Sequence, residues 1–379
     1  MANDHPVVFC HGLFGWGPSE MGGFPYWGTA ASVKSPLARH FASVGPVSST
    51  HDRACELAFQ IKGGQVDYGE THSLEAGHDR FGRTYETSAA FHPDWSDVSP
   101  VHLVGHSMGA PTIWMLQHLL AIDFFGWNSN ANWIKSINTV SGVLNGSTAT
   151  YFLGCSENTG LVEENSIADF LAGAVELSIR LTGDLFDRLY DFDLDHWGLS
   201  CKPEEGLEQQ LTEIASTPMF KGKDNAAYSL TLQGMLEQNL ICLTNPDTFY
   251  FSYATEQTFK GFLSGYYYPQ PRMNPFAIPT SLYIGQKRFK QKIYPDFSAS
   301  DWWQNDGLVS VYSQLYPRTG GDHAIGGEIG SGARFQAGQW YYDVLDCDHI
   351  DIVALPEPDR IGAQALFYQE LFTRLADLP

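Results

Sequence analysis

The sequence has little positive charge and no long apolar run. Its 379 residues contain 22 Lys and Arg against 43 Asp and Glu, which gives a formal net charge of −21. Such a chain repels polyphosphate backbones and anionic membrane surfaces, so nucleic acid is not expected as a partner. No apolar run approaches the roughly 18 to 20 residues that a membrane span needs, so no transmembrane segment is expected either.

Cysteine is scarce and scattered. The six cysteines include no Cys-x-x-Cys pair, so they indicate neither a disulfide framework nor a thiolate metal site. The first residues show no basic region followed by an apolar one, and residues 6–10 already have the pattern of a strand. This start favours a cytoplasmic location, with secretion as the alternative if the natural start has been trimmed.

What the sequence does have is a large apolar content, 43% hydrophobic and 14% aromatic residues, as in globular domains. Short apolar runs at residues 6–10, 101–104, 134–140 and 248–254 alternate with longer segments of helical period. That alternation predicts an α/β fold with a mostly parallel central sheet and helices on both faces, here as one domain over 1–379.

Two segments depart from this pattern. Residues 54–85 have weak periodicity, many glycines and clustered His and Asp, so we expect them to leave the sheet and to need something other than packing to order them. Residues 167–183 have apolar positions at helical spacing, which predicts an amphipathic helix. Periodicity alone favours a surface helix packed on the core over a mobile lid.

The strongest chemical motif is Gly105-His106-Ser107-Met108-Gly109, which follows a predicted strand and precedes a helical stretch with Pro111 in its first turn. Strand, sharp turn and helix are the context in which a G-x-S-x-G serine serves as a nucleophile. The glycines allow the sharp turn that raises the hydroxyl above the sheet edge. We predict that Ser107 is a catalytic nucleophile.

A serine nucleophile needs an imidazole base, which in turn needs a carboxylate. In the fold that carries the G-x-S-x-G turn, the acid follows the serine in the sequence and the histidine follows the acid. His349 precedes the C-terminal helical segment, where the last loop of the fold places the base, and is favoured over His323 in a glycine-rich stretch. For the acid, Asp306 in Asn-Asp-Gly is an ordinary turn residue, and the residues alone leave Asp301 as an alternative.

Acyl transfer also needs backbone N–H donors for the oxyanion that develops on the substrate carbonyl. The loop of residues 11–15, directly after the first strand, is where the fold supplies one donor. Met108, the residue after the nucleophile, supplies the other.

Several stretches in one order resemble the thermoalkalophilic, zinc-containing bacterial lipases of the Geobacillus and Staphylococcus type, within the α/β-hydrolase superfamily. The stretches are Gly15-Trp16-Gly17, Tyr26-Trp27-Gly28, Asp52-Arg53-Ala54-Cys55-Glu56, Val66-Asp67-Tyr68-Gly69, Arg80-Phe81-Gly82-Arg83-Thr84-Tyr85, Tyr190-Asp191-Phe192, Trp197-Gly198-Leu199 and Asn305-Asp306-Gly307. The resemblance covers nearly the whole chain. It implies an α/β-hydrolase fold in which Ser107, Asp306 and His349 form the triad and Leu13 and Met108 hold the oxyanion donors.

The resemblance also implies a structural zinc held by Asp52, His72, His78 and Asp224. The ion would lie in an inserted lobe formed by residues 52–85 and about 196–230, with a helical lid at about 155–189. Two imidazoles and two carboxylates form a closed tetrahedral shell for zinc with no vacant position for a reactive water. Such an ion would order the weakly periodic segment.

A second ion, calcium, is implied near the catalytic histidine, but the positions that match it differ from those of the family. Asp351 stands in place of a glutamate, Arg272 in place of a glycine, and Glu357 is displaced by one residue from the second carboxylate. Carboxylates suit a hard cation, whereas a nearby arginine competes with it.

The reading that follows is a lipase-like serine carboxylester hydrolase that acts on an apolar ester through an acyl-enzyme. An acyltransferase or cyclase with the same triad is the first alternative, because the acyl-enzyme is common to both. A non-catalytic binding protein on a hydrolase scaffold is an alternative of another class, disfavoured by the complete triad. A catalytic metal is disfavoured because four protein ligands leave no open position.

Overall fold

The computed structural model describes residues 3–163, 166, 190–199, 207–289, 293–294, 298–330, 334–354 and 359–379. At its centre lies a seven-stranded sheet of order β10-β11-β7-β6-β5-β1-β2, in which every pair of neighbours is parallel. Its strands are β1 (Val7–Cys10), β2 (Arg39–Ala42), β5 (Val101–His106), β6 (Ile134–Val140), β7 (Phe249–Glu256), β10 (Ala324–Glu328) and β11 (Gln339–Asp346). The four predicted strands coincide with β1, β5, β6 and β7, so the mostly parallel sheet is confirmed.

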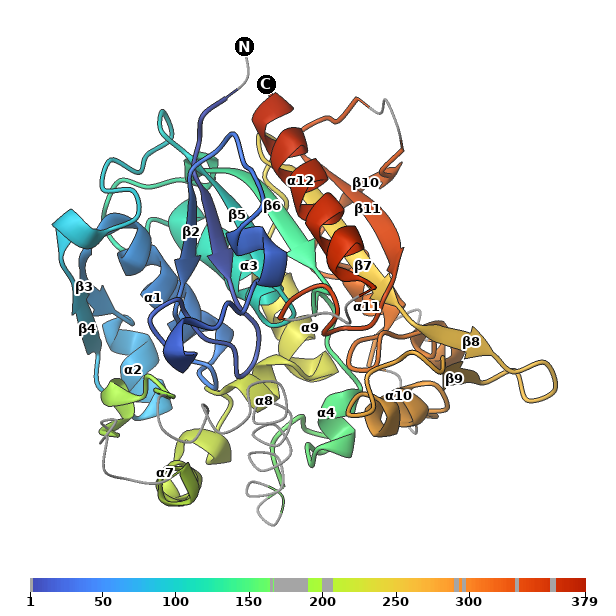
Figure 1. Ribbon diagram of the computed structural model, residues 1–379. Helices are drawn as coiled ribbons and strands as arrows, with labels where there is room; N and C mark the ends of the chain where they lie inside the picture. The colour runs from blue at the N-terminus through green and yellow to red at the C-terminus, as the bar shows by residue number, and fades with distance from the viewer. Residues whose placement is uncertain are drawn as a thin grey trace.

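Helices cover both faces of this sheet, as Figure 1 shows. In β1, Val7 and Phe9 face one core, which includes Tyr368 and Phe372 of the C-terminal helix α12. The alternate residue Val8 faces a second core, shared with helices α1 and α3. Because successive strand residues point to opposite faces, a fully apolar strand buried on both sides is what this layered arrangement requires.

The helices connect and flank the strands. They are α1 (Thr50–Lys62), α2 (Glu70–Ala76), α3 (Gly109–Ala121), α4 (Ala149–Phe152), α7 (Leu207–Ser216), α8 (Ala226–Ser229), α9 (Leu232–Ile241), α10 (Ile278–Ile284), α11 (Val311–Gln314) and α12 (Ile361–Asp377). Single 3₁₀ turns occur at Met21–Gly23, Gly28–Ala31, Thr87–Ala89, Ala131–Trp133, Asp195–Trp197, Met219–Lys221 and Ala299–Trp302. None of the described helices is both long and apolar enough to cross a membrane.

The predicted departure of residues 54–85 from the sheet is wrong for its first part. Residues 54–62 belong to α1, which begins after the Ser49 N-cap and packs on α3 in the second core. Its periodicity is weak in the sequence because Arg53, Glu56 and Gln60 are buried polar residues. The departure begins at the antiparallel hairpin of β3 (Gly64–Asp67) and β4 (Phe81–Tyr85).

One further described segment leaves the central sheet. An antiparallel hairpin of β8 (Thr258–Lys260) and β9 (Tyr267–Pro269) follows β7 and projects from the body of the molecule, as Figure 1 shows. The amphipathic helix predicted over residues 167–183 lies outside the described residues, as does most of the expected lid.

Buried neutral histidines make the fold sensitive to acid. The His102 ring in β5 is fully buried between Ser136 and Asn3, and burial lowers its pKa to about 3. Between its unfolded pKa near 6.5 and this value, the unfolded chain binds a proton that the folded chain does not.

We therefore predict that the free energy of unfolding falls as the pH is lowered from about 6.5, with His102 contributing up to about 1.4 kcal/mol per pH unit. Urea unfolding at pH 7, 6 and 5 measures this dependence. In His102→Gln it should be shallower than in the wild type, and parallel slopes would contradict the assignment.

Candidate active site and metal centre

Ser107 lies at the tip of a sharp turn between β5 and α3. Its backbone φ is 53°, in the left-handed region that a side chain other than glycine enters at a cost of about 1 to 2 kcal/mol. A Cβ on Gly109 would lie 2.0 Å from the Cys10 carbonyl oxygen, and one on Gly105 would lie 2.4 Å from the Gly109 oxygen. The glycines therefore permit a close approach of backbone segments that holds the serine in its strained conformation.

His349 and Asp306 are paired. His349 Nδ1 lies 2.7 Å from Asp306 Oδ2, and the His349 N–H donates to the Asp306 carbonyl oxygen at 3.0 Å. The alternatives that the sequence left open do not take part: the His323 ring contacts Thr244, and Asp301 is exposed. The imidazole thus meets the buried carboxylate that a catalytic base requires.

The Asp306 carboxylate is completely buried and fully supplied with donors. Its Oδ1 accepts from the N–H groups of Leu308 (3.0 Å) and Val309 (2.7 Å), while Oδ2 also accepts from Thr255 Oγ1 (2.7 Å) and Gln314 Nε2 (3.2 Å). Hydrogen bonds to the charged form stabilise it and fix its direction. Thr255 and Gln314 could not be found from the sequence, because their role depends on which segments meet in space.

Ser107 and His349 line one cavity. Most of its other walls are apolar and come from five segments of the chain: Leu13, Phe14 and Trp16; Val143, Ala149 and Leu153; Leu230; Leu308 and Val309; and Ile350 and Val353. The chemical groups therefore open into a site for an apolar molecule.

A chain of hydrogen bonds links the loop after β1 to the base. The Gly12 N–H donates to Tyr26 Oη (2.9 Å), Tyr26 Oη lies 2.6 Å from His106 Nδ1, and His106 Nε2 lies 3.0 Å from the His349 carbonyl oxygen. These partners assign the proton of His106 to Nε2. Burial, followed by the charge of His349, holds the pKa of His106 well below its usual value, so the ring stays neutral and keeps this direction.

The two expected oxyanion donors flank the serine. Within the described part of the chain, neither the Leu13 N–H nor the Met108 N–H has a hydrogen-bond partner. Leu13 lines the cavity, and Met108 is the N-cap of α3 directly after Ser107. Unpaired N–H groups beside a nucleophile are what stabilisation of an oxyanion requires.

A neutral His11 orients the peptide that carries the Leu13 N–H. His11 Nδ1 donates to the Gly12 carbonyl oxygen (2.9 Å), and its Nε2 accepts from the Val44 N–H (3.2 Å). Burial, with the charge of Arg53, lowers the pKa of His11 to about 3, so this tautomer persists at neutral pH.

Arg53 connects the segments that carry both donors. Its buried guanidinium donates to the carbonyl oxygens of His11 (2.5 Å) and Gly45 (2.7 Å) and to Thr112 Oγ1 (3.1 Å). The Thr112 hydroxyl in turn donates to the Met108 carbonyl oxygen (2.9 Å). The sequence analysis gave Arg53 no role, and names it only within one of the stretches that resemble the lipase family.

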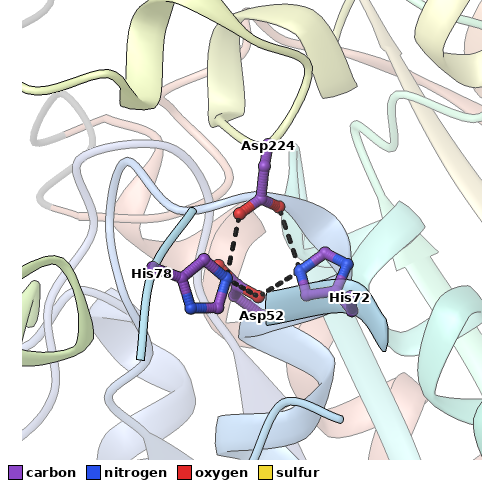
Figure 2. Close-up of side chains that lie close together, drawn as sticks. All are labelled: Asp52, His72, His78 and Asp224. Atoms are coloured by element: carbon purple, nitrogen blue, oxygen red, sulfur yellow. Dashed lines mark hydrogen bonds and ion pairs between the residues drawn. The ribbon is translucent and has the colours of Figure 1, made fainter. Parts of the chain in front are cut away.

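The four predicted metal ligands meet at one point, as Figure 2 shows. One ligand atom from each of Asp52, His72, His78 and Asp224 lies within 4.8 Å of the others. Asp52 comes from α1 and His72 from α2, and Gly77, with φ of 88°, ends α2 and reverses the chain so that His78 reaches the same cluster. These residues can hold a metal ion.

The contacts within the cluster leave ligand atoms unsatisfied. His72 Nε2 lies 2.9 Å from Asp52 Oδ1 and 3.3 Å from Asp224 Oδ1. His78 Nε2 and Asp224 Oδ2 are buried without a hydrogen-bond partner and lie 3.3 Å apart. Despite burial, the contacts with His196 and His72 hold the pKa of Asp52 well below its usual value, so an anionic ligand is available. A cation satisfies such a set where hydrogen bonds do not.

His196 is a further member of this neighbourhood that the sequence analysis missed. Its Nε2 lies 3.3 Å from Asp52 Oδ2, and its Nδ1 lies 3.3 Å from Tyr68 Oη. Tyr68 Oη also donates to Glu56 at 3.1 Å. His196 therefore orients the carboxylate of Asp52, as residues behind a metal ligand do. His196 lies far in the sequence from Asp52, His72 and His78, so spacing gave no signal for it.

The residues expected to bind calcium do not converge. The Asp351 carboxylate accepts from Arg360, and the Arg272 guanidinium lies 3.8 Å from Asp346 instead. Glu357 lies outside the described residues. Because Arg360 already neutralises the Asp351 carboxylate, the prediction of calcium gains no support here.

The comparisons with known proteins agree with the fold described above. The family model described as "Lipase-like, C-terminal domain" matches residues 3–378. Lipase 1 of Staphylococcus aureus is 32% identical over 99% of the chain, and the chain spans about half the length of this curated relative, 54%.

Two solved structures are similar over the whole chain and confirm the α/β-hydrolase fold. EstA from Clostridium botulinum has a TM-score of 0.82 at 31% identity, covering 100% of this chain and 88% of that one. Staphylococcus hyicus lipase has a TM-score of 0.75 at 29% identity, covering 99% and 96%.

We predict that the cluster binds one divalent cation and that binding stabilises the folded chain. A cation at about 100 times its dissociation constant should raise the free energy of unfolding by about 2.7 kcal/mol, because the unfolded chain has no preformed site. Thermal unfolding with and without a chelator measures this effect. Asp224→Asn should lose it, whereas Asp97→Asn, an exposed residue outside the cluster, should keep it; equal responses would disprove the site.

Proposed function

Because the chain belongs to the family of lipase-like C-terminal domains, we propose that it is a serine carboxylester hydrolase that acts on apolar esters through an acyl-enzyme. The observation that carries this proposal is the buried Asp306–His349 pair, which opens into the same apolar cavity as the strained Ser107.

In the proposed reaction, Ser107 Oγ attacks the ester carbonyl carbon while His349 Nε2 takes its proton. Asp306 holds His349 Nδ1 and stabilises the imidazolium that forms. The carbonyl oxygen becomes an oxyanion, and the N–H groups of Leu13 and Met108 stabilise it by donating hydrogen bonds. His349 then gives its proton to the departing alcohol, and water attacks the acyl-enzyme by the same steps in reverse order.

The cavity supports an apolar acyl group as the part of the substrate that is bound. A charged or strongly polar acyl chain would lose its hydration against walls such as Val143, Leu153 and Leu230 without gaining hydrogen bonds. Burial of methylene groups there contributes about 0.8 kcal/mol each, so affinity should rise with chain length until the cavity is full.

We further propose that the metal is zinc and that its role is structural. Asp52, His72, His78 and Asp224 would hold it between α1 and the segments of residues 64–85 and about 196–230, and two imidazoles with two carboxylates suit this ion. The ion supplies charge neutralisation and a cross-link between α1, α2 and the loop that carries Asp224. With four protein ligands it offers no position for a reacting water.

The serine mechanism predicts two distinct losses of activity. Ser107→Ala should abolish turnover of p-nitrophenyl esters from acetate to palmitate, while Asp306→Asn should lower kcat about 10⁴-fold by presenting the wrong histidine tautomer. Spectrophotometry of p-nitrophenol and the mass of the acyl-enzyme measure both. A wild type that acylates Ser107 but releases no acid would identify an acyltransferase, and one that is inert toward all esters would refute the esterase.

If the zinc is structural, its removal should lower the stability of the fold without changing the reactivity of Ser107. Elemental analysis should find one zinc per chain, and chelation should lower Tm. Metal-free protein that is still folded should react with a serine-directed phosphonate at the wild-type rate. Immediate loss of phosphonate reactivity in folded, metal-free protein would instead make the metal catalytic.

A further inference from the structure

The hairpin of β8 and β9 carries the most exposed large apolar side chains of the described residues. Phe262 and Leu263, in the loop that joins the two strands, are 99% and 95% exposed, and Phe259 on β8 is 51% exposed. Figure 1 shows this loop at an outer edge of the molecule. Side chains in this position contribute nothing to the core, so their apolar surface is available to something outside the chain.

The charge around the hairpin is opposite to that of the whole protein. Although acidic residues outnumber basic ones by 43 to 22, none occurs between Glu256 and Asp296. The same stretch contains six basic residues: Lys260, Arg272, Lys287, Arg288, Lys290 and Lys292. Lys260 lies on β8 and Arg288 follows α10, and both side chains are exposed. Lys287 forms an ion pair with Glu157 and Arg272 lies 3.8 Å from Asp346, whereas Lys260 and Arg288 have no acidic partner among the described residues. Since charges are screened within about 8 Å at physiological salt, Lys260 and Arg288 set the local charge of the hairpin.

Aromatic side chains lie beside these cations. The Tyr266 ring is 4.9 Å from that of Trp303, and the Arg288 guanidinium lies 5.5 Å from the Tyr266 ring and donates to its hydroxyl. Tyr268 lies 5.9 Å from Phe259 across the hairpin. Tyrosine, tryptophan and long basic side chains are enriched where a protein meets a lipid–water interface, because each joins an apolar body to a polar end.

Contacts through α10 and α4 link the hairpin to a wall of the cavity. The Tyr267 N–H of β9 donates to the Gly285 carbonyl oxygen, directly after α10. The Tyr283 ring of α10 lies 5.4 Å from that of Phe152, which is 48% exposed at the end of α4. The next residue, Leu153, lines the same cavity as Ser107.

We propose that the β8–β9 hairpin is an interfacial anchor that inserts Phe262 and Leu263 into the surface of an aggregated lipid, with Lys260 and Arg288 against anionic head groups. The proposal rests on the proposed ester hydrolysis for its purpose, since fatty acids released by hydrolysis are themselves anionic. A second copy of the chain is disfavoured as the occupant, because a two-residue tip is far smaller than the roughly 1,000 Å² of a specific interface.

Binding is tested without turnover in the Ser107→Ala chain. Vesicles of phosphatidylcholine with phosphatidylglycerol are sedimented, and the bound fraction gives the partition coefficient. The double variant Phe262→Ser, Leu263→Ser should bind about 10-fold more weakly or worse, because two apolar side chains are lost from the lipid. Val98→Ser removes an apolar residue that is 87% exposed elsewhere and should bind as the parent does.

Charge is tested separately with Lys260→Gln. Its binding to vesicles with phosphatidylglycerol should weaken and lose part of its salt dependence, while binding to pure phosphatidylcholine stays unchanged. Equal binding of parent and double variant, or no binding of the parent to either vesicle, would overturn the anchor. The anchor would also be overturned if sedimentation velocity showed that the parent is a dimer and that the double substitution only separates its two subunits.

Kinetics in the chain with Ser107 intact separate this proposal from the proposed function. The double variant should keep wild-type kcat/KM on dissolved p-nitrophenyl acetate and lose activity about 10-fold on an emulsified long-chain ester. A protein that binds vesicles through the tip but hydrolyses no ester would refute the esterase and leave the anchor standing. Wild-type rates of the double variant on both ester forms would overturn the anchor alone.

Discussion

The arrangement of the site depends on one buried guanidinium, that of Arg53. From α1 it reaches the carbonyl of His11 and, through Thr112, the carbonyl of Met108, so it joins the two peptide segments that carry the proposed oxyanion donors. A buried cation is stable only where donors find acceptors on all sides, which fixes the loop after β1 against the start of α3. Asp52, the preceding residue of α1, belongs to the metal cluster. One helix therefore positions both centres.

The two centres differ in how their buried charged groups are compensated. Both oxygens of the Asp306 carboxylate have donors, and burial keeps His106 and His11 neutral, so these groups need no ion. In the candidate metal cluster, buried His78 Nε2 and Asp224 Oδ2 lie 3.3 Å apart and have no hydrogen-bond partner. The first arrangement suits a reaction in which charge forms transiently, whereas the second can hold a permanent positive charge.

The sequence could predict the strands and the serine turn because both depend on local order. Residues 101–109 carry a buried strand, a glycine-bounded turn and a helix start in consecutive positions, and the structure has all three there. The ligands His72 and His78 were identified through the resemblance to a family. Helix α1 was misjudged because Arg53 and Glu56 interrupt its apolar periodicity, although they are buried to serve partners distant in sequence.

By itself, then, the sequence determined the parallel sheet, the serine turn and the identity of the chemical groups, since periodicity, glycine spacing and residue type act over a few neighbouring positions. Tertiary structure alone decided which carboxylate meets His349, that Thr255 and Gln314 hold it, and that Arg360 pairs with Asp351. The physical reason is that these contacts join segments that only the packing of helices on both faces of the sheet brings within hydrogen-bond distance.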